Sequence, residues 1–518
     1  MEKTGRNIMV AGNLAYKLQE HEKQVEKDYT FLPDKLKHTS ISLLEIVNNK
    51  YRFDAEAFNL DAKVAFNQVK KCKYGFVNLW SEKGFVKDAY YPGRFKRIYV
   101  SKGEGYPFYL PSQLTSIYPK PTKFISEKTY NQIKDIEIVK NNLLLTRSGT
   151  IGKCSVSSKT NIGKVYSDDV IRVSFNGKYD FGFVYAFIQS ETGQLILKTN
   201  NYGAVVRHIE PEHLENVIIP NPPEDIKKKV HELIVRSYDL RDQSNELIDK
   251  AEKTLYEELQ LLPIEELQPK YYDTTKEIRN YQTKLSALNL RFDGSYHLPL
   301  VKEVEKAISK NSKKTQTIKD LSNRIILAGV FKRTYVDKEN GVPFLGGRDI
   351  TQLNPQVEKF LSKSVHKDRI KKELEVFENY VLISDRGTIG KIQIVPKHWN
   401  GWAVSQNIIK VVAEKEISGY LYCFLNSDYG QVLVKREIYG SVVDMIDNKN
   451  VSKIKIPILK NKHKQKEIND LVLKANKLRY EAHIKEQEAI RIVNEDIINA
   501  TEPKFNIAAE RKVKYKRK

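Results

Sequence analysis

The feature of this chain that most constrains its fold is an internal repeat, because a duplicated unit must fold twice along one sequence. The pentapeptide Gly-Thr-Ile-Gly-Lys at residues 149–153 returns letter for letter at residues 387–391, a displacement of 238 residues. Other landmarks keep the same order at displacements of 236 to 239 residues: Arg-Phe-Asp at 52–54 and 291–293, Phe-Lys-Arg at 95–97 and 331–333, Tyr-Val at 99–100 and 335–336, Gly-Gln at 193–194 and 430–431, Tyr-Gly-x-Val-Val at 202–206 and 439–443, and Pro220 and Pro457 after Ile-rich runs. Chance does not keep so many landmarks in register, so the sequence predicts two copies of one domain.

Within each copy, short β-rich runs alternate with turn residues. Residues 143–146 and 381–384 are typical of buried strands that run into the glycine loop, and residues 170–173 and 408–411 are typical of the strands that follow. Residues 185–198 and 420–435 have the length and apolar spacing of one helix lying on that sheet. The pattern predicts an α+β unit of about 150 residues.

A long helical segment follows each copy. Residues 224–262 contain no Gly or Pro and carry apolar residues at helical spacing, and residues 463–500 show the same pattern. Pro223 precedes the first segment, where proline is compatible with a helix start, and Pro263 ends it. A helix of nearly 40 residues spans roughly 55 to 60 Å, which is too long for one small domain to cover.

Such helices need partners, and each is the simplest partner for the other. The predicted fold class is therefore α+β, with two homologous domains separated by two long helices that form an antiparallel coiled coil. An independent helical hairpin behind each domain is the alternative. A rigid pair would hold the two domains at a fixed separation, so that they could read two short segments of a duplex with an unread stretch between them.

The charge balance favours a polyanionic partner. Lys and Arg total 87 against 65 acidic residues, a formal net charge of +22 at pH 7. Nucleic acid fits this balance, although a basic surface that only aids solubility is the alternative. The three cysteines, Cys72, Cys154 and Cys423, are far apart, which predicts neither disulfides nor a zinc site and fits a reducing cytoplasm. The sequence contains no signal-peptide core and no apolar window of membrane-spanning length, so a cytoplasmic location is expected.

Taken together, these motifs resemble the specificity subunits of Type I restriction-modification enzymes over about residues 50 to 500. The Arg-Phe-Asp openings, the Gly-Thr-Ile-Gly-Lys loops and the prolines before each helix carry the resemblance, as does Gly-Val-Pro-Phe-Leu at 341–345 followed by Arg-Asp-Ile at 348–350. The resemblance implies two target-recognition domains, a bipartite double-stranded DNA target and no catalytic activity. It also implies that two methyltransferase subunits dock on the helices and that two restriction-translocase subunits join them, with S-adenosylmethionine, ATP and magnesium belonging to those partners.

The expected domain boundaries follow from the repeat and the resemblance. Residues 1–50 form an N-terminal extension of unknown role, and residues 501–518 form a basic tail. Between them, the order is target-recognition domain 1 (51–222), a central helical spacer (223–290), target-recognition domain 2 (291–460) and a C-terminal helical spacer (461–500).

Basic side chains at repeated positions are the candidates for DNA contact. Lys96, Arg97, Lys332 and Arg333 are predicted phosphate contacts, with a solvated basic strand as the alternative. In the glycine loops, an arginine beside a flexible turn could meet phosphate, but the repeat aligns Arg147 with Asp385 and Ser148 with Arg386, so a loop packed by an arginine ion pair is the alternative. The full set of predicted DNA contacts is Lys96, Arg97, Arg147, Ser148, Lys153, Arg207, Lys332, Arg333, Arg348, Arg386 and Lys391. Tyr202, His208 and Tyr439 are weaker candidates for base contact or stacking, and core packing is favoured for the two tyrosines.

Two other classes of function compete with this interpretation. Asn221-Pro222-Pro223 is similar to the catalytic motif of adenine methyltransferases, but Glu224 occupies the position of the aromatic residue that stacks on the flipped base. No glycine-rich cofactor loop precedes the motif, and the second copy lacks it. A coiled-coil scaffold without a DNA role is the other alternative, and it leaves the two α+β copies and the net charge unexplained.

Overall fold

The structure of the chain is a computed structural model. The repeat seen in the sequence is also visible in this fold. The structure describes residues 40–48, 51, 58–133, 136–148, 151–199, 208–267, 281–288, 290–352, 354–355, 357–440 and 442–500. The chain divides into two compact units, Met1–Asn67 and Gln68–Lys518. In the first unit lies α2 (Leu43–Asn48), and α3 (Leu60–Lys70) crosses the boundary between the units. The strands of both copies and both long helices belong to the second unit. The Arg-Phe-Asp landmark at 52–54 lies outside the described residues.

In the first copy, the described residues form two four-stranded sheets and a two-stranded pair. All neighbouring strands are antiparallel except β4 and β8, which are parallel. In spatial order, the strands are β2 (Val86–Tyr90), β9 (Val170–Phe175), β6 (Leu143–Thr146) and β7 (Cys154–Val156); then β3 (Tyr99–Val100), β5 (Lys123–Ile125), β4 (Tyr106–Tyr109) and β8 (Val165–Tyr166); and the pair β1 (Phe76–Asn78) with β10 (Ile218–Pro220).

The second copy reproduces this topology strand for strand. Its strands, in the same spatial order, are β12 (Arg324–Ile326), β19 (Ile408–Val412), β16 (Val381–Ser384) and β17 (Ile392–Ile394); then β13 (Tyr335–Val336), β15 (Phe360–Ser362), β14 (Gly341–Leu345) and β18 (Ala403–Val404); and the pair β11 (Ser312–Thr317) with β20 (Lys455–Leu459). The register is the same as well, because Leu144 lies opposite Arg172 in one sheet and Leu382 lies opposite Lys410 in the other. The prediction of one duplicated α+β domain is confirmed.

The helix on each sheet differs from the prediction of a single helix. The first copy has α5 (Asp180–Gln189) and α6 (Glu191–Thr199), and the second has α12 (Lys415–Asn426) and α13 (Asp428–Arg436). The chain leaves the helix at Ser190 and Ser427, whose backbones are extended. Each serine hydroxyl then accepts a hydrogen bond from the amide three residues later, at 3.0 Å and 3.2 Å. The serines therefore cap a second helix, and the prediction of one continuous helix was wrong.

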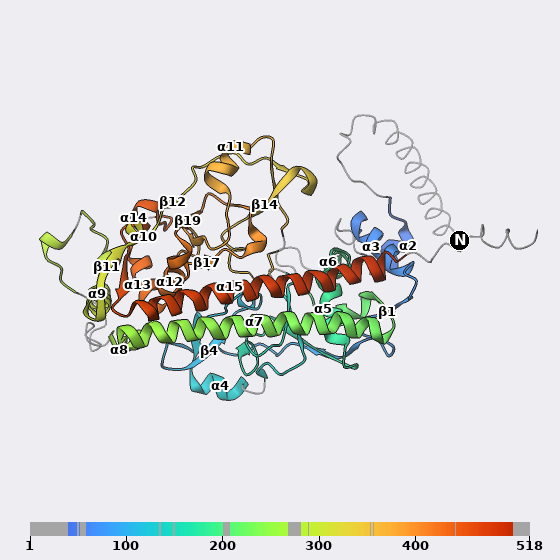
Figure 1. Ribbon diagram of the computed structural model, residues 1–518. Coiled ribbons are helices and arrows are strands. Elements are labelled where there is room, and N and C mark those ends of the chain that lie inside the picture. The colour runs from blue at the N-terminus through green and yellow to red at the C-terminus, as the bar shows by residue number, and fades with distance from the viewer. Residues whose placement is uncertain are drawn as a thin grey trace, which may run out of the picture. The chain divides into compact units, whose positions relative to one another are not determined.

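The two long helices run antiparallel beside each other (Figure 1). Helix α7 (Glu224–Leu259) begins directly after Pro223, and α15 (Lys462–Arg491) continues into the π-helical turn η10 (Ile492–Ile498). The Ser237 hydroxyl donates to the Ala482 carbonyl at 2.8 Å, whereas Lys250 lies 3.8 Å from Glu467. Residue numbers rise along one helix as they fall along the other, which confirms the antiparallel pair.

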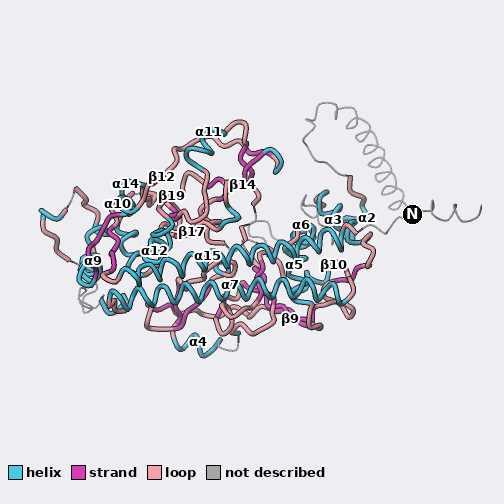
Figure 2. Tube along the Cα trace, in the orientation of Figure 1, coloured by secondary structure: helices cyan, strands magenta, loops and turns pink. Residues whose placement is uncertain are grey.

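In each domain, a glycine allows a helix of the domain to pack closely against the long helix that follows in the sequence. A Cβ atom on Gly182 of α5 would lie 2.8 Å from the His231 Cα in α7, and one on Gly419 of α12 would lie 2.5 Å from the Asn469 carbonyl oxygen in α15. The domains therefore pack backbone to backbone on the helix pair, with their strands outside it (Figure 2).

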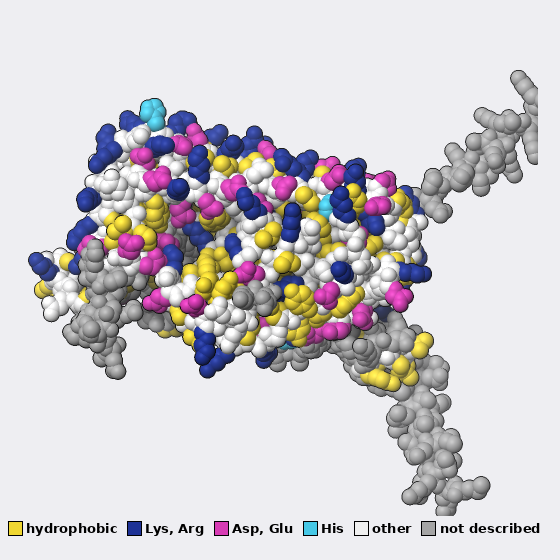
Figure 3. Space-filling model, turned by 90° about the horizontal axis from the view of Figure 1, so that it is seen from below, with side chains coloured by type: hydrophobic (Ala, Val, Ile, Leu, Met, Phe, Trp, Pro, Cys, Tyr) yellow, Lys and Arg dark blue, Asp and Glu magenta, His cyan; other side chains and the backbone are white. Residues whose placement is uncertain are grey.

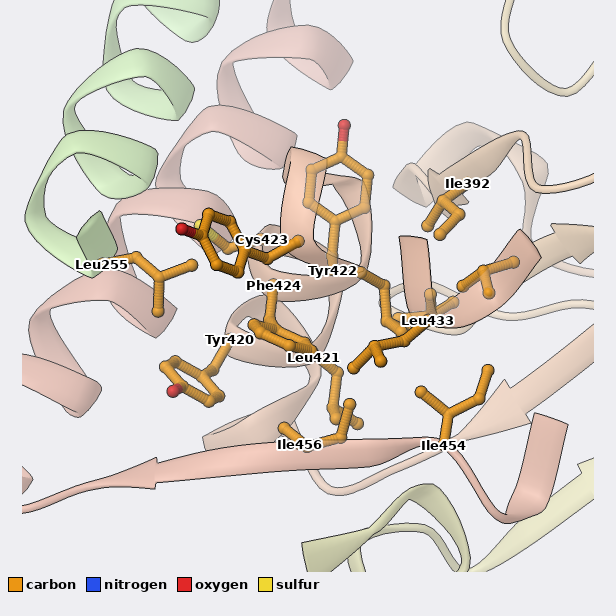
Figure 4. Close-up of a cluster of buried hydrophobic side chains, with 14 of the residues drawn as sticks. Leu255, Ile392, Tyr420, Leu421, Tyr422, Cys423, Phe424, Leu433, Ile454 and Ile456 are labelled. Carbon is orange, nitrogen blue, oxygen red and sulfur yellow. The ribbon is translucent and has the colours of Figure 1, made fainter. Parts of the chain in front are cut away.

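The core of the second domain extends into the helix pair. Leu255 of α7 belongs to the same buried cluster as Tyr420 and Phe424 of α12 and Ile456 of β20 (Figure 4). The central helix thus completes the hydrophobic core of the domain that follows it in sequence.

Candidate nucleic-acid interface

The glycine loops are held in place by their own domains. In the first copy, the Gln194 side-chain amide donates to the carbonyls of Gly152 and Ile188 at 3.1 Å and 2.8 Å. In the second, Gln431 donates to the equivalent carbonyls of Gly390 and Leu425, both at 3.0 Å. Gly152 and Gly390 have φ angles of 81° and 80°, which favour glycine. The loop and the Gly-Gln landmark therefore form one structural unit, while residues 149–150 lie outside the described residues.

Arg147 makes its contacts within its own domain. Its guanidinium bonds to Glu210, with Nε 3.1 Å from Oε2, lies 3.3 Å from Asp169 and stacks 4.4 Å from the centre of the Tyr91 ring. The hydrogen bond to Glu210 raises the pKa of Arg147, so its charge is permanent and already neutralised. The geometry matches the alternative of a loop packed by an arginine ion pair, and a DNA contact by Arg147 stays a prediction.

The equivalent position in the second copy holds Asp385, and the neighbouring residue reaches outward. Burial raises the pKa of Asp385 to about 6. Arg386 is exposed, and its Nε lies 3.5 Å from the Asp385 carboxylate. Ser148, which aligns with Arg386, pairs through its backbone with His208, just as Arg386 pairs with Met445, so the two positions differ in their side chains. Of the two glycine loops, the second therefore has the guanidinium that is better placed to meet a ligand, that of Arg386.

In each Phe-Lys-Arg motif, the arginine side chain contacts its own domain and the lysine side chain is exposed to solvent. Arg97 forms an ion pair with Asp168 and stacks 5.5 Å from the centre of the Phe108 ring. Arg333 repeats the arrangement, donating to the Gln406 side-chain oxygen at 2.6 Å. The arginines therefore hold the segment that leads into β3 or β13 against its domain, whereas the lysines of both motifs, Lys96 and Lys332, are exposed.

Three predicted contacts from the two copies are brought together where the domains meet. We call Lys153, Lys391 and Arg348, with Asp349 and Gln352, the junction cluster. The Lys153 ammonium donates to the Gln352 side-chain oxygen across the junction. Burial lowers the pKa of both Lys153 and Lys391, the charge of Arg348 adds to this effect, and the charge of Asp349 opposes it. Arg348 itself is exposed, so the cluster offers a positive surface at the junction of the domains.

The remaining candidates for DNA contact differ in whether the structure describes them. Arg207, Tyr202 and the basic tail lie outside the described residues. Tyr439 is only half-buried, and its hydroxyl donates to Asp447 at 3.3 Å.

The sequence interpretation missed one basic surface. It covers α11 (Lys367–Arg369) and the following π-helical turn η8 (Ile370–Leu374), labelled at α11 in Figure 1. Its cations, with one lysine just before it, are Lys363, Lys367, Arg369, Lys371 and Lys372. The run of charges in residues 366–372 could have indicated it. On the face seen in Figure 3, by contrast, basic and acidic side chains are interspersed.

The Asn221-Pro222-Pro223 motif has a structural explanation. The amide of Asn221 donates to the Gly75 carbonyl at 3.1 Å, and Pro223 is the N-cap residue directly before α7. The methyltransferase motif has an aromatic residue after the two prolines, and the residue at that position here is Glu224, the first residue of α7. The motif therefore forms the turn from strand β10 into the helix.

Comparison with known protein families identifies the chain. The family model of the Type I restriction modification DNA specificity domain matches it twice, at residues 94–252 and 304–487, more than half of the chain in all. The chain belongs to this family. The first match begins after strand β2, and the second contains all the strands of its domain. Both matches run into the long helix behind the domain, so the chain carries the family's domain in duplicate.

Solved structures of similar proteins include the S subunit of a Type I restriction-modification system from M. genitalium, with 12% identity over 79% of this chain and 92% of that one and a TM-score of 0.29. Another is the HsdS subunit from Thermoanaerobacter tengcongensis, with 12% identity over 76% and 91% of the two chains and a TM-score of 0.24. No curated protein matches the specificity protein.

Along the part of the chain that the structure describes, no helix has the length and apolar character needed to cross a membrane. In the same residues, no group of three or more His, Cys, Asp or Glu side chains could hold a metal ion. The three cysteines are buried and unpaired.

Proposed function

We propose that this specificity protein reads a bipartite DNA target for a Type I restriction-modification complex, with each target-recognition domain reading one half of the target. The observation that carries the proposal is that two copies of one domain are mounted on a single antiparallel helix pair. Such an arrangement presents the same reading surface twice at a separation set by the helices. The exposed lysines and the junction cluster supply cations for the phosphate contacts.

The proposal gives the helix pair a second role as the docking surface for two methyltransferase subunits, to which two restriction-translocase subunits are added. The specificity protein itself is then not an enzyme. S-adenosylmethionine, ATP and magnesium are used by the partner subunits. The family membership and the residues that form the turn at Asn221 support this assignment over that of an independent methyltransferase.

Domain exchange tests the proposal. Residues 75–222 are replaced by those of a relative, and the methylated motif is read by sequencing the genome of cells that also express the methyltransferase subunit. We expect one half of the motif to change and the spacer to stay. The reciprocal exchange of residues 312–459 is the matched control and should change only the other half. A change in both halves after either exchange contradicts one domain per half-site.

A binding experiment tests the assignment of catalysis. The purified chain should bind neither S-adenosylmethionine nor ATP in calorimetry, and co-expression with the methyltransferase subunit should yield a complex that methylates DNA. Methyl transfer by the isolated chain would refute the role as a non-catalytic subunit.

A further inference from the structure

A small cavity lies in the middle of the helix pair. It has a volume of about 20 Å³ and is lined by Arg241 and Ser244 of α7, Arg479 of α15, Trp399 of the second domain and Ile117 of the first. Arg241 and Arg479 are 238 residues apart, so they occupy equivalent positions in the two copies. The antiparallel pair brings these duplicated arginines to the same cavity.

The charges of the two arginines are not balanced by carboxylates among the residues that the structure describes. Both residues are buried, at 5% and 7% exposure, and the fully buried Glu486 pairs with Arg241 at 2.5 Å. Arg479 donates through Nε to the Ser244 hydroxyl at 2.8 Å, and its Nη1 and Nη2 have no acceptor among the described residues. The repeat places Ile248 at the position equivalent to Glu486, so a second carboxylate is not supplied. Two buried cations therefore face one buried anion.

The carboxylate next to Arg241 in the sequence does not supply the missing charge. Asp242 accepts hydrogen bonds from the Ser158 hydroxyl at 2.8 Å, the Lys159 amide at 2.9 Å and the Thr160 amide at 3.1 Å. Its oxygens are thus used by the first domain.

The remaining polar groups of the cavity add further donors. Within the described residues, Nη1 of Arg241 and Nε1 of the fully buried Trp399 also have no acceptor. His398, whose Nδ1 likewise has no partner there, stacks on His483 at 3.9 Å, and burial lowers its pKa to about 2, so it adds no charge. Each buried donor without an acceptor has lost its hydrogen bond to water and gained none in exchange, which is unfavourable. A site that contains several N–H donors and an uncompensated positive charge calls for a negatively charged acceptor.

We propose that this cavity binds one monatomic anion of the size of chloride, held by Arg241, Arg479 and Trp399. The volume exceeds the roughly 10–15 Å³ that a single water-sized particle needs, so it can hold one monatomic ion. Water could accept the hydrogen bonds, but it would leave the charge uncompensated. Because Arg241 and Arg479 lie on the two long helices and Trp399 lies in the second domain, the bound anion joins these three elements.

Halide-dependent stability tests the proposal on the full chain. Thermal unfolding is followed at constant ionic strength while sodium gluconate is replaced by sodium chloride or bromide. We expect both halides to raise Tm by at least about 2 °C. Arg479→Met removes the uncompensated charge and should abolish most of this rise. Lys477→Met, which removes an exposed cation from the same helix, should retain it. The proposal is overturned if Tm in either halide equals Tm in gluconate, or if the halide response of Arg479→Met is unchanged.

A second variant and a crystal make the test independent of how well Arg479→Met folds. Trp399→Phe keeps the ring packing and removes one donor, so the halide concentration giving half of the Tm rise should increase several-fold. Crystals soaked in bromide should show an anomalous peak within hydrogen-bond distance of Trp399 Nε1 and the Arg479 guanidinium. An unchanged half-maximal concentration, a cavity without an anomalous peak, or equal stabilisation by sulfate refutes a halide-sized site.

Discussion

Replacing Glu486 by glutamine should destabilise the specificity protein by about 3–5 kcal/mol, the usual cost of breaking a buried ion pair. The fully buried Glu486 carboxylate accepts hydrogen bonds from Arg241 of α7, Tyr185 of the first domain and Asn354 of the second. A glutamine side chain offers one acceptor oxygen and presents its own N–H donors to the remaining partners. The substitution therefore leaves Arg241 buried without a counter-charge and at least one donor without an acceptor.

Urea unfolding followed by circular dichroism measures this loss. The control is Glu481→Gln on the same helix, because Glu481 and its partner Lys477 are 43% and 75% exposed and their pair should contribute less than about 1 kcal/mol. Arg241 holds the pKa of Glu486 below its usual value of 4.5. The stabilisation is therefore complete above that value and is lost as the pH falls through the lower folded-state pKa. A loss within about 1 kcal/mol of that in Glu481→Gln would refute the reasoning.

Three further predictions concern the sheets, the helices and DNA. Gly430→Ala should destabilise the second domain by more than about 2 kcal/mol in thermal unfolding, because the added Cβ would lie 2.0 Å from the Phe424 carbonyl oxygen. Lys410→Met should stabilise the protein by up to about 3 kcal/mol in urea at pH 7, since burial lowers the pKa of Lys410 to about 8, and the gain should fade between pH 8 and 10.5. The double variant Lys96→Ala, Lys332→Ala should lower the slope of DNA affinity against salt by about 2 and leave the recognised sequence unchanged, as measured by fluorescence anisotropy.

The repeat made the fold predictable, because its landmarks are positions where backbone geometry restricts the side chain. Gly193 and Gly430 show this directly, since a Cβ on either would lie within 2.0 Å of a carbonyl oxygen of the preceding helix. The break of that helix was not predicted, because Ser190 and Ser427 are tolerated in a helix and nothing in the apolar spacing changes there. At Gly193 and Gly430 the backbone approaches a carbonyl of the preceding helix, and this contact requires the chain to turn. It can be recognised only when the positions of both helices are known.

The surroundings of the candidate DNA contacts were harder to predict than the fold, because equivalent residues of the two copies contact different side chains. Arg97 faces the carboxylate of Asp168, whereas Arg333 faces the amide of Gln406. Composition and repetition mark both arginines as basic, but only the fold shows that each turns inward while the neighbouring lysine turns outward. The alternation of side chains along an extended segment could have separated them.

Duplication around an antiparallel helix pair has a consequence that neither copy shows alone. Residues near the middle of the pair meet their own duplicates, as Ser116 pairs with Gln352 and Arg241 shares a cavity with Arg479. An apolar residue can meet its duplicate without penalty, but a buried cation cannot. The middle of the pair must therefore either diverge between the copies or bind a counter-ion. The specificity protein has diverged at one position, where Glu486 in one copy stands against an isoleucine in the other, and this supplies one of the two charges that the arginines require.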